Sequence, residues 1–407
     1  MNVLFLSQRV PYPPNRGDKI TTWRLVERLG RRHRVRIVAF AHDAADLAAA
    51  RYLTERGFPT YVFRTHPRWD RLRSLPLLLT RAPLTLGVFG SRALQAAVGH
   101  LAAESDLGYA YSSSMGAFLL PHPELARVMH FAELDSDKWR QYAARTRPPR
   151  RWIYAREHAT LLAYETRLAR SFDENIFCTP LEAEIFRARI PGPSSIVLRN
   201  GVDLEHFRPA PDAAEPGHLV FVGVMDYYPN VEGCVWFVEE ILPKVQDRVP
   251  EARLSIVGAH PVPAVRRLAR RPGVVVTGYV DDPRDWLRRA AVSVAPLRIA
   301  RGIQNKVLEA MAMGLPVVGT GAATQGVEGR PGEHYLVADE PGAQAEAIAR
   351  LLADRGEARR LGERARRFVA ERYDWEVTLA PLDALIERLA TREGQTGASG
   401  RFSAAAR

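Results

Sequence analysis

The sequence predicts an α/β protein with two Rossmann-like, doubly wound domains. The chain has 407 residues, which is enough for two hydrophobic cores. Short apolar segments alternate with longer helical patterns along both halves, as is typical of parallel sheets covered by helices. A connector rich in Pro and Ala, HFRPAPDAAEPGH, separates the halves at residues 206–218. We therefore expect a first domain over residues 1–205 and a second over residues 219–371.

Apolar segments with β-type composition mark the expected strands in order. In the first half they are residues 2–7, 35–40, 59–64, 108–114, 127–132, 174–179 and 195–200. In the second half they begin at residues 218, 252, 274, 292, 316 and 334. The strongly basic region 140–170 predicts two helices with a break at Pro148 and Pro149. Residues 391–407 have the composition of a disordered tail.

Cysteine content, hydropathy and net charge indicate the compartment and the binding partners to expect. Cys178 and Cys234 are far apart and outside any disulfide or metal spacing, which favours a reducing cytoplasm. No apolar run approaches a membrane span, and the first residues lack the basic lead and cleavage site of a signal peptide. The net charge of +11 suits an anionic membrane or anionic substrates, but it also fits a merely Arg-rich composition. We do not expect nucleic-acid binding, because the basic residues are spread over both halves without a recognisable module.

One segment has the character of a membrane-surface helix. Residues 63–89 mix Arg and Trp with aliphatic residues. The side chains that would meet an anionic membrane are Trp69, Leu72, Leu75 and Leu78, together with Arg68, Arg71 and Arg73. The same segment can instead pack against its own domain. The protein is thus expected to be cytoplasmic, with peripheral contact at the inner face of the cell membrane as one interpretation.

The most informative stretch is RGIQNKVLEAMAMGLPVV, residues 301–318. It predicts a loop, a helix over residues 304–313 and a buried strand, with Gly314 and Pro316 ending the helix. A helix that begins in the loop after a strand offers free backbone N–H groups and a positive dipole end to an anion. Lys306 and Glu309 share one face of this helix. The lysine suits a diphosphate and the carboxylate suits ribose hydroxyls, although the two residues could also form an ordinary exposed ion pair.

The distribution of lysine supports a functional interpretation. Only four of the 57 Lys and Arg residues are lysines. Three of the four (Lys19, Lys138 and Lys306) lie in segments that also carry other candidate site residues. The first segment follows the strand at residues 2–7 and contains Arg16, Gly17 and Asp18, where Asp18 can face a sugar hydroxyl or cap the next helix.

The stretch at 301–318 resembles the signature of retaining glycosyltransferases of family 4, which have the GT-B fold. In that family a Glu, seven residues and a second Glu precede Ala-Met-Ala-x-Gly. Glu309 matches the second Glu and AMAMGLPVV matches closely, whereas Arg301 stands where the first Glu is expected. The sequence RGIQNKVLEAMA also resembles sugar transferases associated with the PEP-CTERM/exosortase exopolysaccharide system.

The resemblance implies two Rossmann-like domains facing across a cleft, with residues 372–390 forming a helix that returns to the first domain. It implies a hexosyl transfer that retains configuration, from a UDP- or GDP-linked sugar to a lipid-linked saccharide or polysaccharide, without cofactor or metal. The Asp135-Ser136-Asp137 triplet is therefore not expected to bind a metal. Asp135 and Lys138 are instead expected at the acceptor, together with Arg16, Gly17, Asp18 and Lys19; the alternative is that Asp135 or Ser136 caps a helix.

The donor-side residues follow from the same resemblance. The family places an Arg and a Lys after the first strand of the second domain, but this chain has Val224-Met225-Asp226 and Glu232-Gly233 there. Our hypothesis is that Arg298, Arg301 and Lys306 replace this pair and stabilise the leaving diphosphate, with Arg301, Lys306 and Glu309 as catalytic residues. The remaining donor-binding candidates are Gly278, Val280, Gly302, Ile303, Gln304 and Asn305.

Two other functions remain open from the sequence. A nucleotide-sugar epimerase can share this fold and would need no acceptor. A non-catalytic protein that binds nucleotide or polysaccharide would account for the absence of the family's Arg and Lys.

Overall fold

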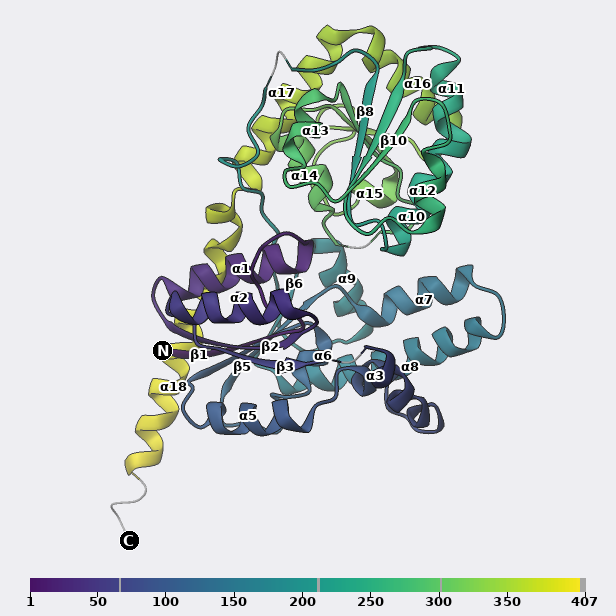
Figure 1. Cartoon of the computed structure of the whole chain (residues 1–407). Coiled ribbons are helices and arrows are strands. Elements are labelled where there is room, and N and C mark those ends of the chain that lie inside the picture. Colours follow the sequence, from purple (N-terminus) through teal and green to yellow (C-terminus); the bar gives the residue numbers. More distant parts are fainter. Residues whose placement is uncertain (66, 211–212, 301, 403–407) are drawn as a thin grey trace. The chain divides into compact units, whose positions relative to one another are not determined.

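The computed structural model describes residues 1–65, 67–210, 213–300 and 302–402. The chain divides into two units, each built on its own parallel sheet (Figure 1). Unit 1 comprises Met1–Leu198 and Leu379–Arg407, and unit 2 comprises Arg199–Thr378. The α/β class with two doubly wound sheets is confirmed.

Unit 1 contains a seven-stranded sheet with the order β3-β2-β1-β4-β5-β6-β7, and every neighbouring pair is parallel. Its strands are β1 (Asn2–Ser7), β2 (Arg34–Ala41), β3 (Thr60–Arg64), β4 (Leu107–Tyr111), β5 (Ala126–Ala132), β6 (Glu174–Phe177) and β7 (Ser195–Val197). All seven were predicted. β4 ends earlier than expected because Ser112 has φ +81° and turns the chain into α6.

Helices connect these strands and lie on both faces of the sheet, with α1 and α2 on one face and α5 on the other (Figure 1). They are α1 (Gly17–Gly30), α2 (Ala44–Glu55), α3 (Pro67–Ser74), the 3-10 helix η1 (Leu75–Leu79), α4 (Leu84–Val88), α5 (Arg92–Ala102), α6 (Ser113–Gly116), α7 (Asp135–Arg145), α8 (Arg150–Ser171) and α9 (Pro180–Arg189). The two helices expected in the basic region are α7 and α8, and the Pro-Pro pair separates them as predicted.

Unit 2 contains a six-stranded parallel sheet with the order β10-β9-β8-β11-β12-β13. Its strands are β8 (His218–Val222), β9 (Arg253–Val257), β10 (Val274–Gly278), β11 (Val292–Ala295), β12 (Val317–Gly319) and β13 (Leu336–Val337). Its helices are α10 (Tyr228–Trp236), the π-helical turn η2 (Phe237–Ile241), α11 (Leu242–Gln246), α12 (Pro263–Leu268), α13 (Arg284–Arg289), α14 (Asn305–Ala312), α15 (Gly321–Thr324), α16 (Pro341–Ala353) and α17 (Arg355–Arg372). Most side chains of these strands are apolar and belong to the buried core of unit 2, because helices cover both faces of the sheet.

The connector between the sheets packs against unit 2. The Val202 N–H donates to the Tyr373 carbonyl (2.7 Å), and Arg199 pairs with Glu328. Arg366 donates to the Phe207 carbonyl (3.0 Å). The boundary between the units therefore falls after Leu198, whereas composition had suggested a linker at 206–218.

The last helix, α18 (Trp375–Phe402), begins in unit 2 and continues into unit 1. In unit 1, Asp383 accepts from Arg28 at 2.7 and 3.1 Å, and Arg388 pairs with the buried Glu174. The backbone remains helical beyond residue 390, where the sequence suggested a disordered tail, because an established helix adds residues at little cost. Within the part of the chain that is described, no helix is long and apolar enough to cross a membrane.

Two helical glycines provide a matched test of packing in unit 2. A Cβ on Gly362 of α17 would lie 1.9 Å from the Gly314 carbonyl oxygen, so α17 can approach the end of α14 only with glycine there. A Cβ on the exposed Gly342 of α16 would meet nothing within 4 Å. Gly362→Ala should therefore lower the free energy of unfolding by about 2 kcal/mol or more in urea titrations. Gly342→Ala should be neutral or stabilise by up to about 1 kcal/mol, and equal effects of the two changes would contradict this packing.

Candidate functional site

The strand order of unit 2 places a switch point between the carboxyl ends of β8 and β11, and we term this region the crevice. From β8 the chain moves outward through β9 and β10, then returns to β11 and moves the other way through β12 and β13. The loops that follow β8 and β11 therefore diverge, and in open α/β sheets this switch point is where ligands bind. The RGIQNKVLEAMA stretch forms the loop after β11 and the start of α14.

Helix α14 presents Lys306 at this crevice because its other face is apolar. Val307, Leu308 and Met311 are fully buried in the core of unit 2. Lys306 and Glu309 remain partly exposed. The residue before the helix, Gln304, has extended backbone geometry and does not cap it with its side chain. The Val307 N–H donates to the Gln304 carbonyl (2.9 Å), and the positive end of the helix dipole lies in the same turn of α14 as Lys306.

A residue that the sequence did not single out holds Lys306. Its Nζ donates to Asn230 Oδ1 (2.6 Å) and lies 4.5 Å from the centre of the Phe221 ring. Asn230 is almost fully buried, and its Nδ2 donates to the Val224 carbonyl (2.8 Å). Asn230 therefore joins the loop after β8 to the helix after β11 across the switch point. One feature of the sequence could have indicated this residue. Asn230 directly follows Pro229 in the first turn of α10, the helix that comes after the first strand of unit 2.

Burial changes the proton affinities of both charged residues of α14. It lowers the pKa of Lys306 to about 8, and the nearby Cys234 and Glu309 only partly oppose this. It raises the pKa of Glu309 to about 7, against the opposing effect of Lys306. In the described part of the chain, the Glu309 carboxylate accepts no hydrogen bond. The pair is thus not an ordinary exposed ion pair, because Lys306 bonds to Asn230 and burial shifts the pKa of both groups.

Glycines allow the strand ends to approach closely at the crevice. A Cβ on Gly258 would lie 1.7 Å from the Gly223 carbonyl oxygen, and one on Gly223 would lie 3.2 Å from Lys306 Nζ. Gly302 has φ +62° and Gly278 has φ +71°, and a Cβ on either would meet nothing within 4 Å. These two glycines are needed for their backbone conformation and leave open space beside them.

The other donor-side candidates fall into different positions. Ile303 is buried in the core, so it can contribute only its backbone. Asn305 Oδ1 accepts from Asn200 at 3.4 Å, and Val280 is partly buried after β10. Arg301 lies outside the described residues.

Arg298 is directed to a different part of unit 2. It forms an ion pair with Glu232 and lies 5.0 Å from the centre of the Trp236 ring. The structure thus does not bring Arg298 together with Lys306, because the Arg298 guanidinium is paired with Glu232. Glu232 is one of the residues that stand where the glycosyltransferase family has its diphosphate-binding Lys.

The switch point of unit 1 lies between β1 and β4. Gln8 Nε2 donates to Ser114 Oγ (2.7 Å) across it. Asp18 pairs with Arg16 (2.9 Å) and Arg9 (3.3 Å) and does not cap α1. Gly17 is the exposed first residue of α1.

Lys19 has a different environment from its neighbours. Its Nζ donates to Asp46 Oδ1 (2.7 Å), and both residues are buried. Asp46 also accepts from the His42 N–H (2.9 Å). This ion pair joins α1 to α2, so Lys19 has a structural contact rather than the open position expected of an acceptor residue.

The Asp135–Lys138 segment forms a charged cluster at the start of α7. Asp135 accepts from Lys138 (2.7 Å) and from Ser113 Oγ (2.7 Å), and Lys138 also donates to Glu133 (2.6 Å). Burial opposes the charge of Lys138, but Asp135 and Glu133 raise its pKa well above the ordinary value. Asp137 is buried and paired with Arg140 and Arg189.

Neither Asp135 nor Ser136 caps α7. The N–H groups of Leu134 and Ser136 donate instead to the buried carboxylates Glu182 (3.1 Å) and Glu165 (3.0 Å). Burial raises the pKa of Glu165 to about 8 and that of Glu182 to about 7. Glu165 and Glu182 thus satisfy the start of α7, while the two oxygens of Asp135 accept from Lys138 and Ser113.

The class of fold is now defined: two Rossmann-like units, each with polar groups at its switch point, make a GT-B fold. Solved structures agree over nearly the whole chain. Sucrose-phosphate synthase from Thermosynechococcus elongatus superimposes with a TM-score of 0.72 at 19% identity, covering 96% of this chain and 100% of that one. The complex of Anabaena HepE with UDP-glucose gives a TM-score of 0.71 at 16% identity, covering 95% and 100%. At these identities the likeness shows the fold alone.

The match to a family model lies within unit 2. Residues 216–354 match the family model described as "Glycosyl transferases group 1". The phosphatidyl-myo-inositol mannosyltransferase of Mycobacterium tuberculosis is 30% identical over 214 residues, which cover 49% of this chain and 55% of that protein. The GDP-mannose-dependent alpha-(1-6)-phosphatidylinositol monomannoside mannosyltransferase of the same species is 31% identical over 216 residues, covering 47% and 55%. The chain thus spans about half the length of these curated relatives.

The environment of Lys306 can be measured directly because the chain has only four lysines. In a ¹³C NMR titration of lysine Cε signals, one signal should titrate near pH 8, since burial lowers that pKa, and Lys306→Arg should remove it. Asn230→Asp should move the same signal to higher pH, because it places a negative charge beside the ammonium. Four signals that all titrate above pH 10 would contradict the described site.

Proposed function

We propose that this protein is a retaining glycosyltransferase that uses a UDP- or GDP-linked sugar as donor and a lipid-linked saccharide or polysaccharide as acceptor. The observation that carries the proposal is the Lys306 ammonium, held by Asn230 at the switch point of unit 2 beside the first turn of α14. Burial lowers the pKa of Lys306, so an anionic ligand beside it would stabilise the charged ammonium. A diphosphate is the anion that commonly binds at the switch point of such a fold.

In the proposed reaction the donor diphosphate lies against Lys306 and the N–H groups of α14. The bond between the sugar C1 and the diphosphate oxygen breaks, and negative charge accumulates on the leaving group. Lys306 and the helix dipole stabilise that charge in a site with little water, which is usually the largest contribution to catalysis. The acceptor hydroxyl oxygen bonds to C1 on the same face, and its proton passes to the leaving phosphate. Glu309 accepts hydrogen bonds from the ribose hydroxyls.

We assign the acceptor to unit 1. Asp18 and Asp135 are carboxylates near the carboxyl ends of its strands, and each is oriented by cationic or hydroxyl neighbours. Such groups suit hydroxyl-rich ligands. The named activities of the two mycobacterial relatives support a lipid-linked acceptor. The resemblance to exosortase-associated transferases supports a place in exopolysaccharide synthesis.

Donor binding provides the first test. We expect calorimetry to find one of UDP or GDP bound, and its sugar conjugate to be slowly hydrolysed with retained configuration. Lys306→Ala should reduce the rate by about 100-fold or more because it removes one stabilising donor. Glu309→Ala should weaken binding, and affinity should fall above pH 8 as Lys306 loses its proton. The exposed Lys244 on α11 provides a matched control, and Lys244→Ala should change nothing.

Other outcomes would select other functions. Release of an epimer from the donor alone indicates an epimerase. Tight nucleotide binding without hydrolysis or transfer indicates a binding protein. If no nucleotide binds, the proposal is wrong.

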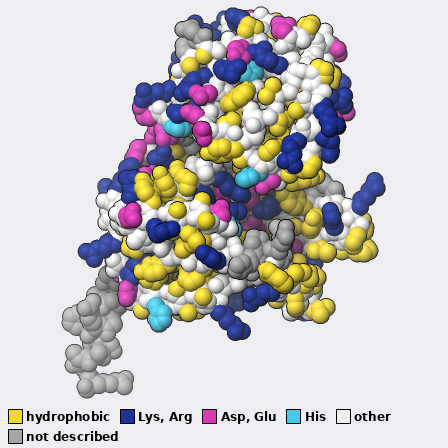
Figure 2. All heavy atoms as spheres, in the orientation of Figure 1, with side chains coloured by type: hydrophobic (Ala, Val, Ile, Leu, Met, Phe, Trp, Pro, Cys, Tyr) yellow, Lys and Arg dark blue, Asp and Glu magenta, His cyan; other side chains and the backbone are white. Residues whose placement is uncertain are grey.

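We also propose that unit 1 contacts an anionic membrane surface. Trp69, Leu72, Leu75 and Leu79 are 51–94% exposed, and Trp152 at the start of α8 is 68% exposed. Arg156 of α8 donates to the carbonyls of Leu77, Thr80 and Ala82, so η1 and the start of α8 lie side by side. Hydrophobic side chains gather over this part of unit 1 (Figure 2). Leu78 is only partly exposed, and the side chains of Arg68 and Arg71 lie outside what the structure describes.

Vesicle sedimentation tests this contact. The protein should bind vesicles that contain phosphatidylglycerol more strongly than phosphatidylcholine vesicles, because the net positive charge favours an anionic surface, whereas the apolar patch contributes to binding of both. Leu79→Ser combined with Trp152→Ser should reduce binding by about 10-fold or more. Val275→Ser, at an exposed apolar position of β10, should leave it unchanged. Equal binding of both vesicle types by all variants would contradict the proposal.

A further inference from the structure

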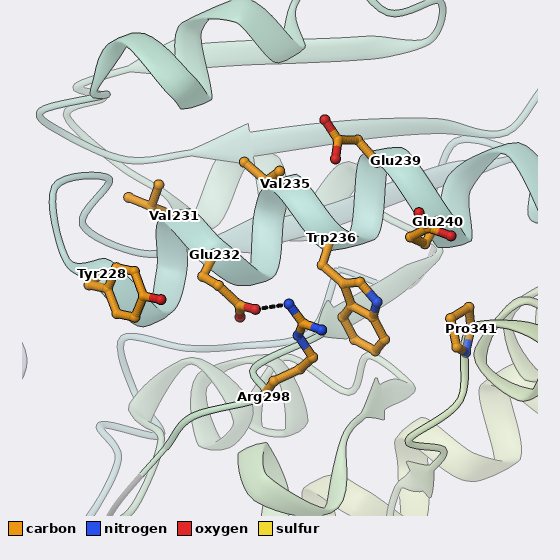
Figure 3. A pocket seen from close by; sticks show the side chains of 9 residues that line it. All are labelled: Tyr228, Val231, Glu232, Val235, Trp236, Glu239, Glu240, Arg298 and Pro341. Carbon is orange, nitrogen blue, oxygen red and sulfur yellow. Dashed lines mark hydrogen bonds and ion pairs between the residues drawn. The ribbon is translucent and has the colours of Figure 1, made fainter. Parts of the chain in front are cut away.

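Unit 2 has a pocket of about 510 Å³ that the proposed donor site does not use. Its lining residues are Tyr228, Val231, Glu232, Val235, Trp236, Glu239, Glu240, Arg298 and Pro341 (Figure 3). All but Arg298 and Pro341 come from one continuous face of α10 and η2. The volume is within the range of pockets that bind small ligands.

This pocket is distinct from the crevice at Lys306. Asn230 and Glu232 are two positions apart on α10, and residues so spaced do not share a helix face. Asn230 therefore faces Lys306, whereas Glu232 faces Arg298 in the pocket. Neither Lys306 nor Glu309 contributes to the lining.

The chemistry of the lining combines aromatic surface with planar charged groups. The Arg298 guanidinium is paired with Glu232 and lies 5.0 Å from the centre of the Trp236 ring, and Tyr228 is 56% exposed (Figure 3). Val231 and Val235 add apolar surface between these groups. The exposed Tyr228 ring can pack against the C–H face of a pyranose, whereas Trp236 is buried beneath Arg298 and forms the floor of the pocket. Carboxylate and guanidinium groups offer acceptors and donors to the sugar hydroxyls.

Two further observations bear on the ligand. Glu239 and Glu240 are adjacent and both exposed, and they lie on the π-helical turn η2; such turns occur frequently at functional sites. The second oxygen of Glu232 is buried and accepts no hydrogen bond from the described residues. The lining thus has three carboxylates against one guanidinium, in a chain whose net charge is +11. This local excess of negative charge disfavours an anionic ligand.

We propose that this pocket binds a saccharide unit that carries no negative charge, separately from the donor site. The choice of a saccharide rests on the proposed glycosyltransferase function, whereas the preference against anions rests on the lining itself. The pocket would hold part of a growing or finished saccharide chain on unit 2.

The test compares three tetrasaccharides by calorimetry: a neutral glucose tetramer, a glucosamine tetramer and a galacturonate tetramer. We expect the neutral or the amine-bearing tetramer to bind, and the galacturonate tetramer to bind at least 10-fold more weakly. Tyr228→Ala combined with Glu240→Gln should weaken binding about 10-fold or more. Glu346→Gln, at an exposed carboxylate of α16 outside the pocket, is the matched control and should have no effect.

Three results would contradict the proposed saccharide site. Failure of both uncharged and amine-bearing tetramers to bind would overturn the proposal, as would tighter binding of galacturonate or binding that the paired variant leaves unchanged. Lys306→Ala separates this pocket from the donor site, since it should abolish nucleotide binding and leave tetramer binding intact. If the wild-type protein binds a tetramer in this manner but binds no nucleotide, the pocket is retained and the transferase proposal fails.

Discussion

The contact between Lys306 and Asn230 is the interaction on which the proposed site depends. Burial that lowers the pKa of Lys306 from 10.5 to about 8 corresponds to roughly 3 kcal/mol of unfavourable free energy for the charged form. The protein tolerates this cost because α14 is fixed by fully buried side chains such as Val307 and Met311. A single neutral amide leaves the ammonium only partly compensated. An anion that enters the crevice can therefore recover much of this free energy as binding or as transition-state stabilisation.

Backbone packing gives the ammonium its position. The close approach of Gly223 and Gly258 brings the ends of β8 and β9 together, and the Gly223 N–H donates to the Val257 carbonyl (3.0 Å). Asn230 then secures the loop after β8 through Val224. The contacts of Gly223 with Gly258 and Val257 are between backbone groups, so the ends of the two strands are fixed by the sheet, and the buried Asn230 amide adds one side-chain contact. Preorganised groups of this kind need no rearrangement when charge develops.

The sequence was sufficient to predict the strands and α14, because apolar periodicity and Gly or Pro boundaries report local structure directly. It was not sufficient to predict partners between distant segments. Lys19 appeared available beside Asp18, but the fold places Asp46 against it; Arg298 appeared to be a donor-binding cation, but Glu232 engages it. Asn230 was missed for the same reason, since its importance comes from Lys306, 76 positions later. Side-chain pairing across a sheet depends on strand order, which local patterns do not specify.

The two units have the same type of switch point but different chemistry there. In unit 1 the contact across it, Gln8 with Ser114, is neutral, and the nearby Asp18 and Asp135 are already accompanied by cations or hydroxyls. In unit 2 the corresponding contact carries an under-compensated ammonium at a helix N-terminus. An environment of balanced charges suits a polyhydroxyl ligand, whereas an excess of positive charge suits a diphosphate. This difference supports assigning the acceptor to unit 1 and the donor to unit 2, because each ligand then meets the groups that complement its charge.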